Sequence, residues 1–216
     1  MTPEDLAREI STLGAATERF VVAVAGPPGA GKSTLAQEIA QSIGESARVV
    51  PMDGFHYDNA VLDRLGLRAR KGAPETFDTL GFVHLLQRLR AGGDAAIPVF
   101  DRDMDLARAG ADLVTVTDKY LIVEGNYLLL NDAPWCDLAP LFDLTVFIDV
   151  PEDELDRRLV QRWHHHGKTP AEARHWIDSN DLPNIRRVTR GSRQADIVFR
   201  QGSGIAFAGN DPKGRP

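Results

Sequence analysis

The chain has 216 residues, a length that favours one domain with a single core. Hydrophobic residues make up 43% and charged residues 26%, as in an ordinary soluble globular protein. The formal net charge of −6 argues against general affinity for nucleic acid or acidic membrane surfaces, while leaving room for a locally positive cleft. The single cysteine, Cys136, cannot form an internal disulfide, and no apolar run resembles a signal peptide or a membrane span, so we expect a cytoplasmic protein.

Short apolar runs alternate with amphipathic segments along the chain. Helical spacing predicts helices at 2–13, 32–43, 60–67, 80–89, 152–163 and 170–177. The apolar runs predict buried strands at 20–25, 48–52, 120–123, 144–150 and 195–199. This order predicts an α/β fold with a parallel five-stranded sheet flanked by helices. We expect residues 1–200 to form one domain and the tail 201–216, rich in Gly and Pro, to be frayed.

Three of the predicted strands end at chemically useful groups. The first leads into a glycine-rich turn, the second into Asp53 and the third into Glu124. Ligands of parallel sheets bind outside the carboxyl ends of the strands. We therefore expect these three features to share one edge of the sheet.

The glycine-rich turn reads Gly26-Pro27-Pro28-Gly29-Ala30-Gly31-Lys32-Ser33, followed by Thr34, and matches the phosphate-loop pattern G-x-x-x-x-G-K-S/T. Glycines allow successive backbone N–H groups to point at phosphate oxygens, and the following helix adds its positive N-terminus. Lys32 can reach the β and γ phosphates, and the Ser33 hydroxyl can bind Mg²⁺. The predicted ligands of residues 26–34 are ATP and Mg²⁺. A chance match is the alternative, and the strand before and helix after argue against it.

A phosphate loop also occurs in GTPase switches, ATPases and motor proteins. Switch GTPases need an N-K-x-D base-reading motif, which this sequence does not contain. The stretches 63–66 and 78–81 match D-x-x-G, but neither follows a buried strand. An ATP-binding regulatory protein and an ATPase without a metabolite acceptor stay open as alternatives to a kinase.

Asp53 and Glu124 are the candidate acids beside the phosphates. Asp53 could accept the proton of an attacking hydroxyl, or bind Mg²⁺ through water. The alternative is a turn-forming Asp-Gly pair. Glu124 could organise Mg²⁺ through water or hold an acceptor hydroxyl, and a simple strand-end acid is its alternative.

Arg158 and Arg162 lie four residues apart, on one face of the predicted helix 152–163. They could stabilise charge on a transferred phosphoryl group, and a solvated basic face is the alternative. Adjacent residues on a helix point in different directions, which argues against a metal site formed by His164, His165 and His166.

Several separated motifs resemble the uridine kinase and type I pantothenate kinase group. Besides the phosphate loop they are Asp53-Gly54-Phe55, 70–78, 97–100, Glu124-Gly125-Asn126 and 180–185, in that order over about residues 20–200. The sequence of residues 124–130, together with Pro134-Trp135, most resembles a bacterial branch labelled fructose transport system kinases. Uridine kinases have serine, phenylalanine and tyrosine after the aspartate, where this chain has Gly54-Phe55-His56.

The resemblance implies a P-loop NTPase fold with ATP on the loop, Asp53 as catalytic base and a helical lid at about 152–178. The lid would close Arg158 and Arg162 over the phosphates. The implied acceptor pocket is bordered by Phe55, His56, Tyr57, Asp101, Arg102 and Asn184. The expected reaction transfers the γ-phosphate of ATP to a hydroxyl of a nucleoside, a pantothenate-like compound or a sugar such as fructose. A homodimer would suit the family, and no nucleic-acid or membrane partner is expected.

Overall fold

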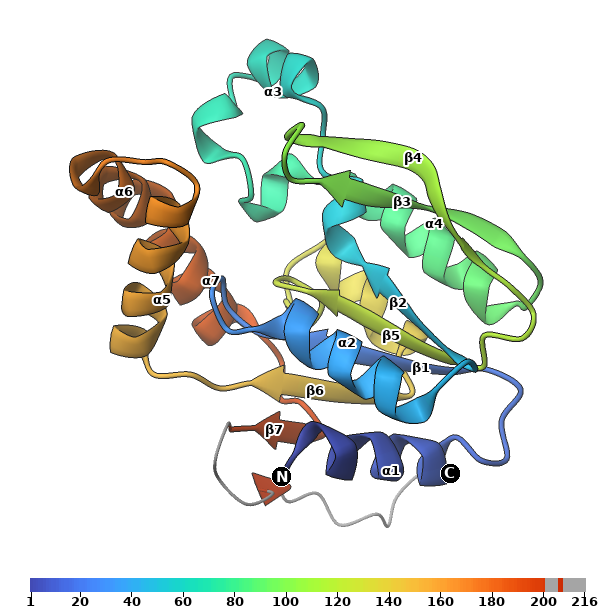
Figure 1. Ribbon diagram of the computed structural model, residues 1–216. Coiled ribbons are helices and arrows are strands. Elements are labelled where there is room, and N and C mark those ends of the chain that lie inside the picture. Colours follow the sequence, from blue (N-terminus) through green and yellow to red (C-terminus); the bar gives the residue numbers. More distant parts are fainter. Residues whose placement is uncertain (201–205, 208–216) are drawn as a thin grey trace.

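The computed structural model of the protein describes residues 1–200 and 206–207. Helices cover both faces of a mainly parallel sheet (Figure 1). In spatial order its strands are Ala47–Pro51 (β2), Tyr120–Gly125 (β5), Phe20–Ala25 (β1), Leu144–Ile148 (β6), Ile197–Phe199 (β7) and the antiparallel Ala206–Phe207 (β8). The five predicted strands are the five parallel ones, and the prediction of a parallel α/β sheet is confirmed.

The helices follow the predicted pattern with one addition. They are Pro3–Leu13 (α1), Lys32–Ile43 (α2), Asn59–Leu65 (α3), Thr79–Arg90 (α4), Glu152–His165 (α5), Pro170–Trp176 (α6) and Leu182–Gly191 (α7). The π-helical turn Ile177–Asp181 continues α6 into α7, which was not predicted. In Figure 1, α5, α6 and α7 lie beyond the carboxyl ends of the central strands.

Each face of the sheet carries its own hydrophobic cluster. Alternate residues of β1 point to opposite faces, so Val21 and Ala23 join α4 and the segment 127–141, whereas Val22 and Val24 join α1, α2 and α5. All residues of β1 are buried. Burial on both faces explains why this strand is a continuous apolar run.

A β-hairpin outside the main sheet was not predicted. Its strands Ala95–Asp101 (β3) and Leu106–Val114 (β4) pair antiparallel, with a register shift between Ile97 and Val99. The hairpin packs against the 3₁₀ turn Met52–Phe55, where the backbones come so close that a Cβ on Gly54 would collide with the carbonyl of Pro98. The hairpin turn therefore lies next to the residues that come directly after β2.

Two expectations concern the periphery of the molecule. The frayed tail expected at 201–216 lies outside the described residues, apart from 206–207 in β8. In the described part of the chain, the helices are too short or too polar to cross a bilayer.

Candidate active site

The phosphate loop connects β1 to α2, as the sequence predicts. Gly29 and Gly31 adopt φ values of 82° and 91°, in the left-handed region that favours glycine. Gly31 directly precedes α2, so the first N–H groups of that helix open toward the loop. A Cβ on Gly29 would also touch Leu159 of α5 at 3.4 Å. The loop thus has the backbone shape of an anion site, and it packs against α5.

Lys32 is buried in the first turn of α2, with 8% of its surface exposed. Its Nζ donates a hydrogen bond to the carbonyl oxygen of Pro27 at 2.9 Å, which places the ammonium across the loop. Burial lowers the pKa of Lys32 to about 8, although the negative charges of Glu124 and Asp53 partly oppose this. The side chain is held as a local positive charge at considerable electrostatic cost.

Ser33 and Glu124 form a pair of oxygen donors beside the lysine. The Ser33 hydroxyl donates to Glu124 Oε1 at 3.1 Å, and Glu124, at the end of β5, is 6% exposed. Burial and the nearby Asp53 raise the pKa of Glu124, and the Lys32 ammonium partly offsets them. A hydroxyl and a carboxylate next to a phosphate loop are the hard oxygen ligands that suit Mg²⁺. In the described residues no cluster of three or more His, Cys, Asp or Glu could hold a metal by itself, so phosphate and water would complete such a site.

Asp53 lies in the 3₁₀ turn after β2, at the same edge as the loop and Glu124. The parallel register pairs Pro51 of β2 with Glu124 of β5, and Gly125 of β5 with Ala25 of β1. The Asp53 side chain is 26% exposed, and its Oδ2 accepts a hydrogen bond from Arg102 Nη2 at 3.2 Å. The structure therefore brings the three strand-end features together.

Arg158 and Arg162 project from α5 on the side of the loop. Arg158 Nη1 lies 3.5 Å from the Gly29 carbonyl oxygen and 3.4 Å from that of Ala30, and its Nε donates to Glu154 Oε1. Arg162 is half-buried, and burial together with the charge of Arg102 lowers its pKa. The carboxylates of Asp181 and Asp53 act in the opposite direction on Arg162.

On the predicted acceptor side, the His56 ring contacts the rings of Phe77 and Phe100 in tilted arrangements, with centroids 4.0 and 4.7 Å away. Its Nδ1 lies 2.8 Å from the Asp53 carbonyl oxygen, and burial lowers its pKa. Phe55 packs on Phe82 at a centroid distance of 4.9 Å. These rings form an aromatic wall behind Asp53.

Four further predicted pocket residues have different surroundings. Tyr57 is half-buried, and its backbone N–H donates to the Thr76 carbonyl. The Asp101 carboxylate accepts hydrogen bonds within the hairpin, from the Met104 N–H at 3.0 Å and from Arg108 at 3.4 Å. Arg102 contacts Asp53, as described above, and Asn184 is buried in α7 with 3% exposure. Asn184 thus contacts Arg70 of the segment 70–78, and Asp101 belongs to the hairpin.

Sequence reasoning named no side-chain role for Arg70 and Asn180. Arg70 Nη1 donates to Asn180 Oδ1 at 2.8 Å and Nη2 to Asn184 Oδ1 at 3.3 Å, while Asn180 Nδ2 donates to the Lys71 carbonyl at 2.9 Å. Both residues belong to motifs that carry the family resemblance, and this membership was the one sequence feature that could have indicated a functional role. Their partnership joins segments about a hundred residues apart, and no local pattern reveals it.

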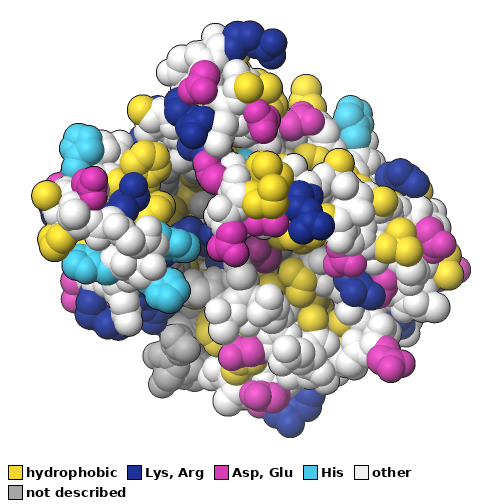
Figure 2. All heavy atoms as spheres, turned by 45° about the horizontal axis from the view of Figure 1, so that its top comes forward, with side chains coloured by type: hydrophobic (Ala, Val, Ile, Leu, Met, Phe, Trp, Pro, Cys, Tyr) yellow, Lys and Arg dark blue, Asp and Glu magenta, His cyan; other side chains and the backbone are white. Residues whose placement is uncertain are grey.

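One face of the molecule is hollowed. Figure 2 shows a depression between the part that carries a cluster of histidine side chains and the remainder of this face, with acidic and basic side chains both reaching its rim. His164 and His165 end α5, and His166 is its C-cap residue. Burial and the charge of Arg162 lower the pKa of His166.

Comparison with known proteins shows the family to which the chain belongs. The model of the phosphoribulokinase / uridine kinase family matches residues 21–206. The chain belongs to this family. It is 34% identical over 197 residues to a putative uridine kinase of Schizosaccharomyces pombe, covering 85% of this chain and 84% of that one. It is 30% identical over 150 residues to a pantothenate kinase of Mycolicibacterium vanbaalenii, covering 67% and 48%.

Solved structures give the same result. The crystal structure of a putative fructose transport system kinase from Silicibacter sp. TM1040 superimposes with a TM-score of 0.87 at 40% identity, covering 92% of this chain and 99% of that one. The P-loop kinase fold and the family predicted from the motifs are confirmed. Since its relatives are small-molecule kinases, the protein is a phosphotransferase acting on a small metabolite.

Proposed function

We propose that the protein transfers the γ-phosphate of ATP to a hydroxyl of a small metabolite, with Asp53 as the general base. The observation that carries this proposal is the shared edge: the register of β2, β5 and β1 sets Asp53, Glu124 and the phosphate loop side by side. A carboxylate in that position can take the proton of a hydroxyl that attacks the terminal phosphate.

The donor side follows from the loop. The amides of residues 26–34 and the Lys32 ammonium bind the phosphates. Ser33 and Glu124, which are hydrogen-bonded to each other, would hold Mg²⁺, directly or through water. When bound, the ion neutralises negative charge on the phosphate oxygens.

Arg158 and Arg162 complete the charge balance. We assign residues of about 152–178 to a lid, because α5 packs Leu159 on the loop glycine and places Arg158 on the loop carbonyls. Guanidinium groups in this position stabilise charge on the transferring phosphoryl group. The electrostatic influence of Asp53 on Arg162 supports a location near the point of transfer.

The acceptor belongs to the pocket between the aromatic wall, the hairpin turn and Asn184. Relatives named for uridine, pantothenate and fructose support three classes to test: a nucleoside, a pantothenate-like compound and a sugar. We expect one class to raise ADP release well above the rate with MgATP alone. An ATP-binding regulatory protein predicts no stimulation by any compound, and an ATPase without an acceptor predicts substantial release with none added.

The role of Asp53 is tested with Asp53→Asn. We expect kcat to fall by about 10²–10⁴-fold with the active acceptor, because the proton then lacks a receiver. The affinity for MgATP, measured by calorimetry, is expected to change by less than about threefold, since the phosphates bind to the loop. Asp137→Asn, at an exposed position outside the site, is the matched control. A kcat within about threefold of the parent would show that Asp53 is not the base.

A further inference from the structure

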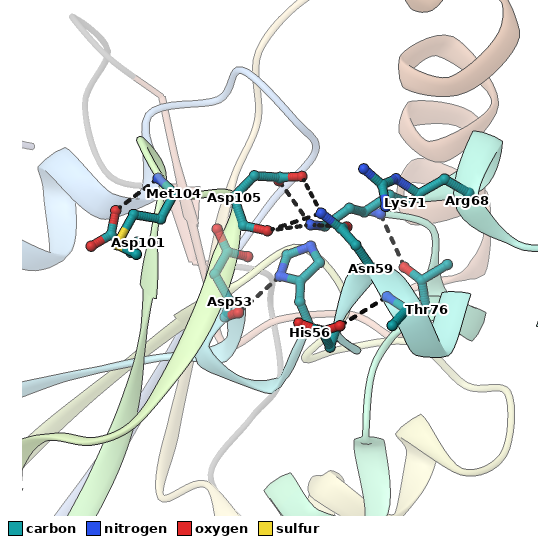
Figure 3. Close-up of polar contacts among 12 residues, drawn as sticks. Asp53, His56, Asn59, Arg68, Lys71, Thr76, Asp101, Met104 and Asp105 are labelled. Carbon is teal, nitrogen blue, oxygen red and sulfur yellow. Dashed lines mark hydrogen bonds and ion pairs between the residues drawn. The ribbon is translucent and has the colours of Figure 1, made fainter. Parts of the chain in front are cut away.

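Lys71 is a half-buried cation on the acceptor side that the phosphate-transfer steps do not use. Its side chain is 11% exposed. The ammonium donates to Asn59 Oδ1 and to the Asp105 carbonyl oxygen, both at 2.7 Å, and lies 2.8 Å from Asp105 Oδ1 (Figure 3). It also lies 5.2 Å from the ring centre of Phe100. Because the Lys71 ammonium contacts several groups at once, it holds the segments that carry them together.

These partners come from separate segments of the chain. Asn59 begins α3, Phe100 belongs to β3, and Asp105 lies in the turn between β3 and β4. Asn59 itself donates to Asp105 Oδ2 at 3.0 Å, so both groups converge on one turn residue. We call Asn59, Lys71 and Asp105 the turn clasp.

The backbone of Asp105 adopts an uncommon conformation. Among the described residues it is the one residue other than glycine with a positive φ, 52°. Aspartate enters this left-handed region more readily than most residues with a Cβ. The clasp holds Asp105 in this conformation through its side chain and its carbonyl oxygen, and the Met104 N–H donates to Asp101 Oδ1 at the other end of the same turn.

The turn also carries Arg102, whose guanidinium bonds Asp53 Oδ2 at 3.2 Å. Fixing residue 105 therefore restricts where residue 102 can place its side chain.

We propose that Lys71 is a positioning residue: through Asp105 and Asn59 it holds the hairpin turn so that Arg102 orients the Asp53 carboxylate toward the acceptor hydroxyl. This proposal rests on the function proposed above. Lys71 acts through the turn, and the residue that touches the proposed base is Arg102.

The first test needs no acceptor. Hydrogen exchange of the turn peptide 101–106 is compared between the parent and Lys71→Met, which removes the charge and keeps the length. We expect exchange about tenfold faster in the turn and unchanged exchange in the phosphate loop. Lys119→Met is the matched control, because Lys119 also donates to a backbone carbonyl and also lies over an aromatic ring, far from the site. Unchanged exchange in the turn overturns the proposal, whatever the acceptor proves to be.

The second test is a double-mutant cycle, with ADP release measured for the most active compound of the nucleoside, pantothenate and sugar panel. Lys71→Met and Arg102→Gln are each expected to lower kcat/KM by about tenfold to a hundredfold, as displacement of a reacting group does. The double variant is expected to be no worse than the poorer single one, because both act through one contact. If the two single-variant losses in kcat/KM multiply in the double variant, the proposal is wrong.

Failure of the proposal for Lys71 can be distinguished from failure of the proposed function. If Asp53→Asn retains activity, the base is misassigned, yet the exchange experiment still reports whether Lys71 holds the turn. A MgATP affinity that stays within about twofold in Lys71→Met shows that the loop is intact. If that affinity falls with turnover, Lys71 has a general structural role and the proposal is wrong.

Discussion

Replacing both Lys32 and Glu124 by neutral residues of similar size is expected to stabilise the protein while abolishing binding of MgATP. Both side chains are buried, and burial favours the neutral form of each: it lowers the pKa of Lys32 and raises the pKa of Glu124. The folded protein without nucleotide therefore carries charges that its own surroundings do not fully compensate. The variant Lys32→Met/Glu124→Gln removes both.

The size of the effect follows from Lys32. Its pKa falls from 10.5 to about 8, and each unit corresponds to about 1.4 kcal/mol, so keeping it charged at pH 7 costs about 3 kcal/mol. The variant also loses the hydrogen bond to Pro27, worth about 1–2 kcal/mol. Glu124 adds a contribution of the same sign. We expect a net gain of about 2 kcal/mol, within the range of about 1–4 kcal/mol for replaced buried ion pairs.

The pH dependence provides an independent check. Because the folded pKa of Lys32 lies below its unfolded value, the parent gains stability as pH rises from about 8 to 10.5. Because the folded pKa of Glu124 lies above its ordinary value of 4.5, the parent loses stability as pH rises from that value through the raised one. The advantage of the double variant is therefore largest near neutral pH and smaller on both sides.

Urea unfolding without nucleotide measures the difference in stability between the parent and the double variant. Calorimetry confirms that the double variant no longer binds MgATP. Each single variant leaves one buried charge without its partner, so it is expected to be less stable than the double variant. The reasoning is refuted if the double variant is less stable than the parent by more than about 1 kcal/mol at pH 7. An advantage that does not vary between acidic and alkaline pH would refute it equally.

Three further predictions concern single residues. Gly54→Ala is expected to cost about 1–3 kcal/mol in urea unfolding and to lower kcat, because its Cβ would push β3 away from the turn that carries Asp53. Arg162→Gln is expected to lower kcat by about 10²–10³-fold, with a much smaller change in KM for ATP. If kcat and KM for ATP change by equal factors, Arg162 does not act specifically on the transition state. Ser33→Ala is expected to raise the Mg²⁺ concentration for half-maximal activity by about 10–100-fold, and an unchanged Mg²⁺ titration would contradict the ligand assignment.

The central sheet and the phosphate loop were predictable because their signals are local. β1 is buried on both faces, so its residues must be apolar without alternation. The loop needs glycine at particular φ values and a lysine within reach, and both constraints fall within eight consecutive residues. Parallel pairing then brought Asp53 and Glu124 to the same edge without any long-range guess.

The hairpin was missed because its sequence lacks a strand signal. Pro98 interrupts β3 at the register shift, and β4 is largely exposed and contains alanine, glycine and charged residues in place of branched apolar ones. Helix α7 was missed for a related reason, since Pro183 suggests a break and is tolerated here in the first turn. The turn clasp joins Asp105 to residues 34 and 46 positions earlier in the chain and exists only through tertiary structure.

The π-helical turn Ile177–Asp181 contacts both halves of the proposed site. Asn180 contacts Arg70 and the Lys71 carbonyl on the acceptor side, whereas the adjacent Asp181 accepts a hydrogen bond from Trp163 of α5 at 2.7 Å. Neighbouring residues of a helical turn point in different directions, so a single turn can reach both sides of the cleft. The inserted residue of a π turn also rotates the next helix about its axis, and such turns are frequent at functional sites. One short turn, in which Ile177, Asn180 and Asp181 are buried, thus connects the arginine-bearing helix to the acceptor segment.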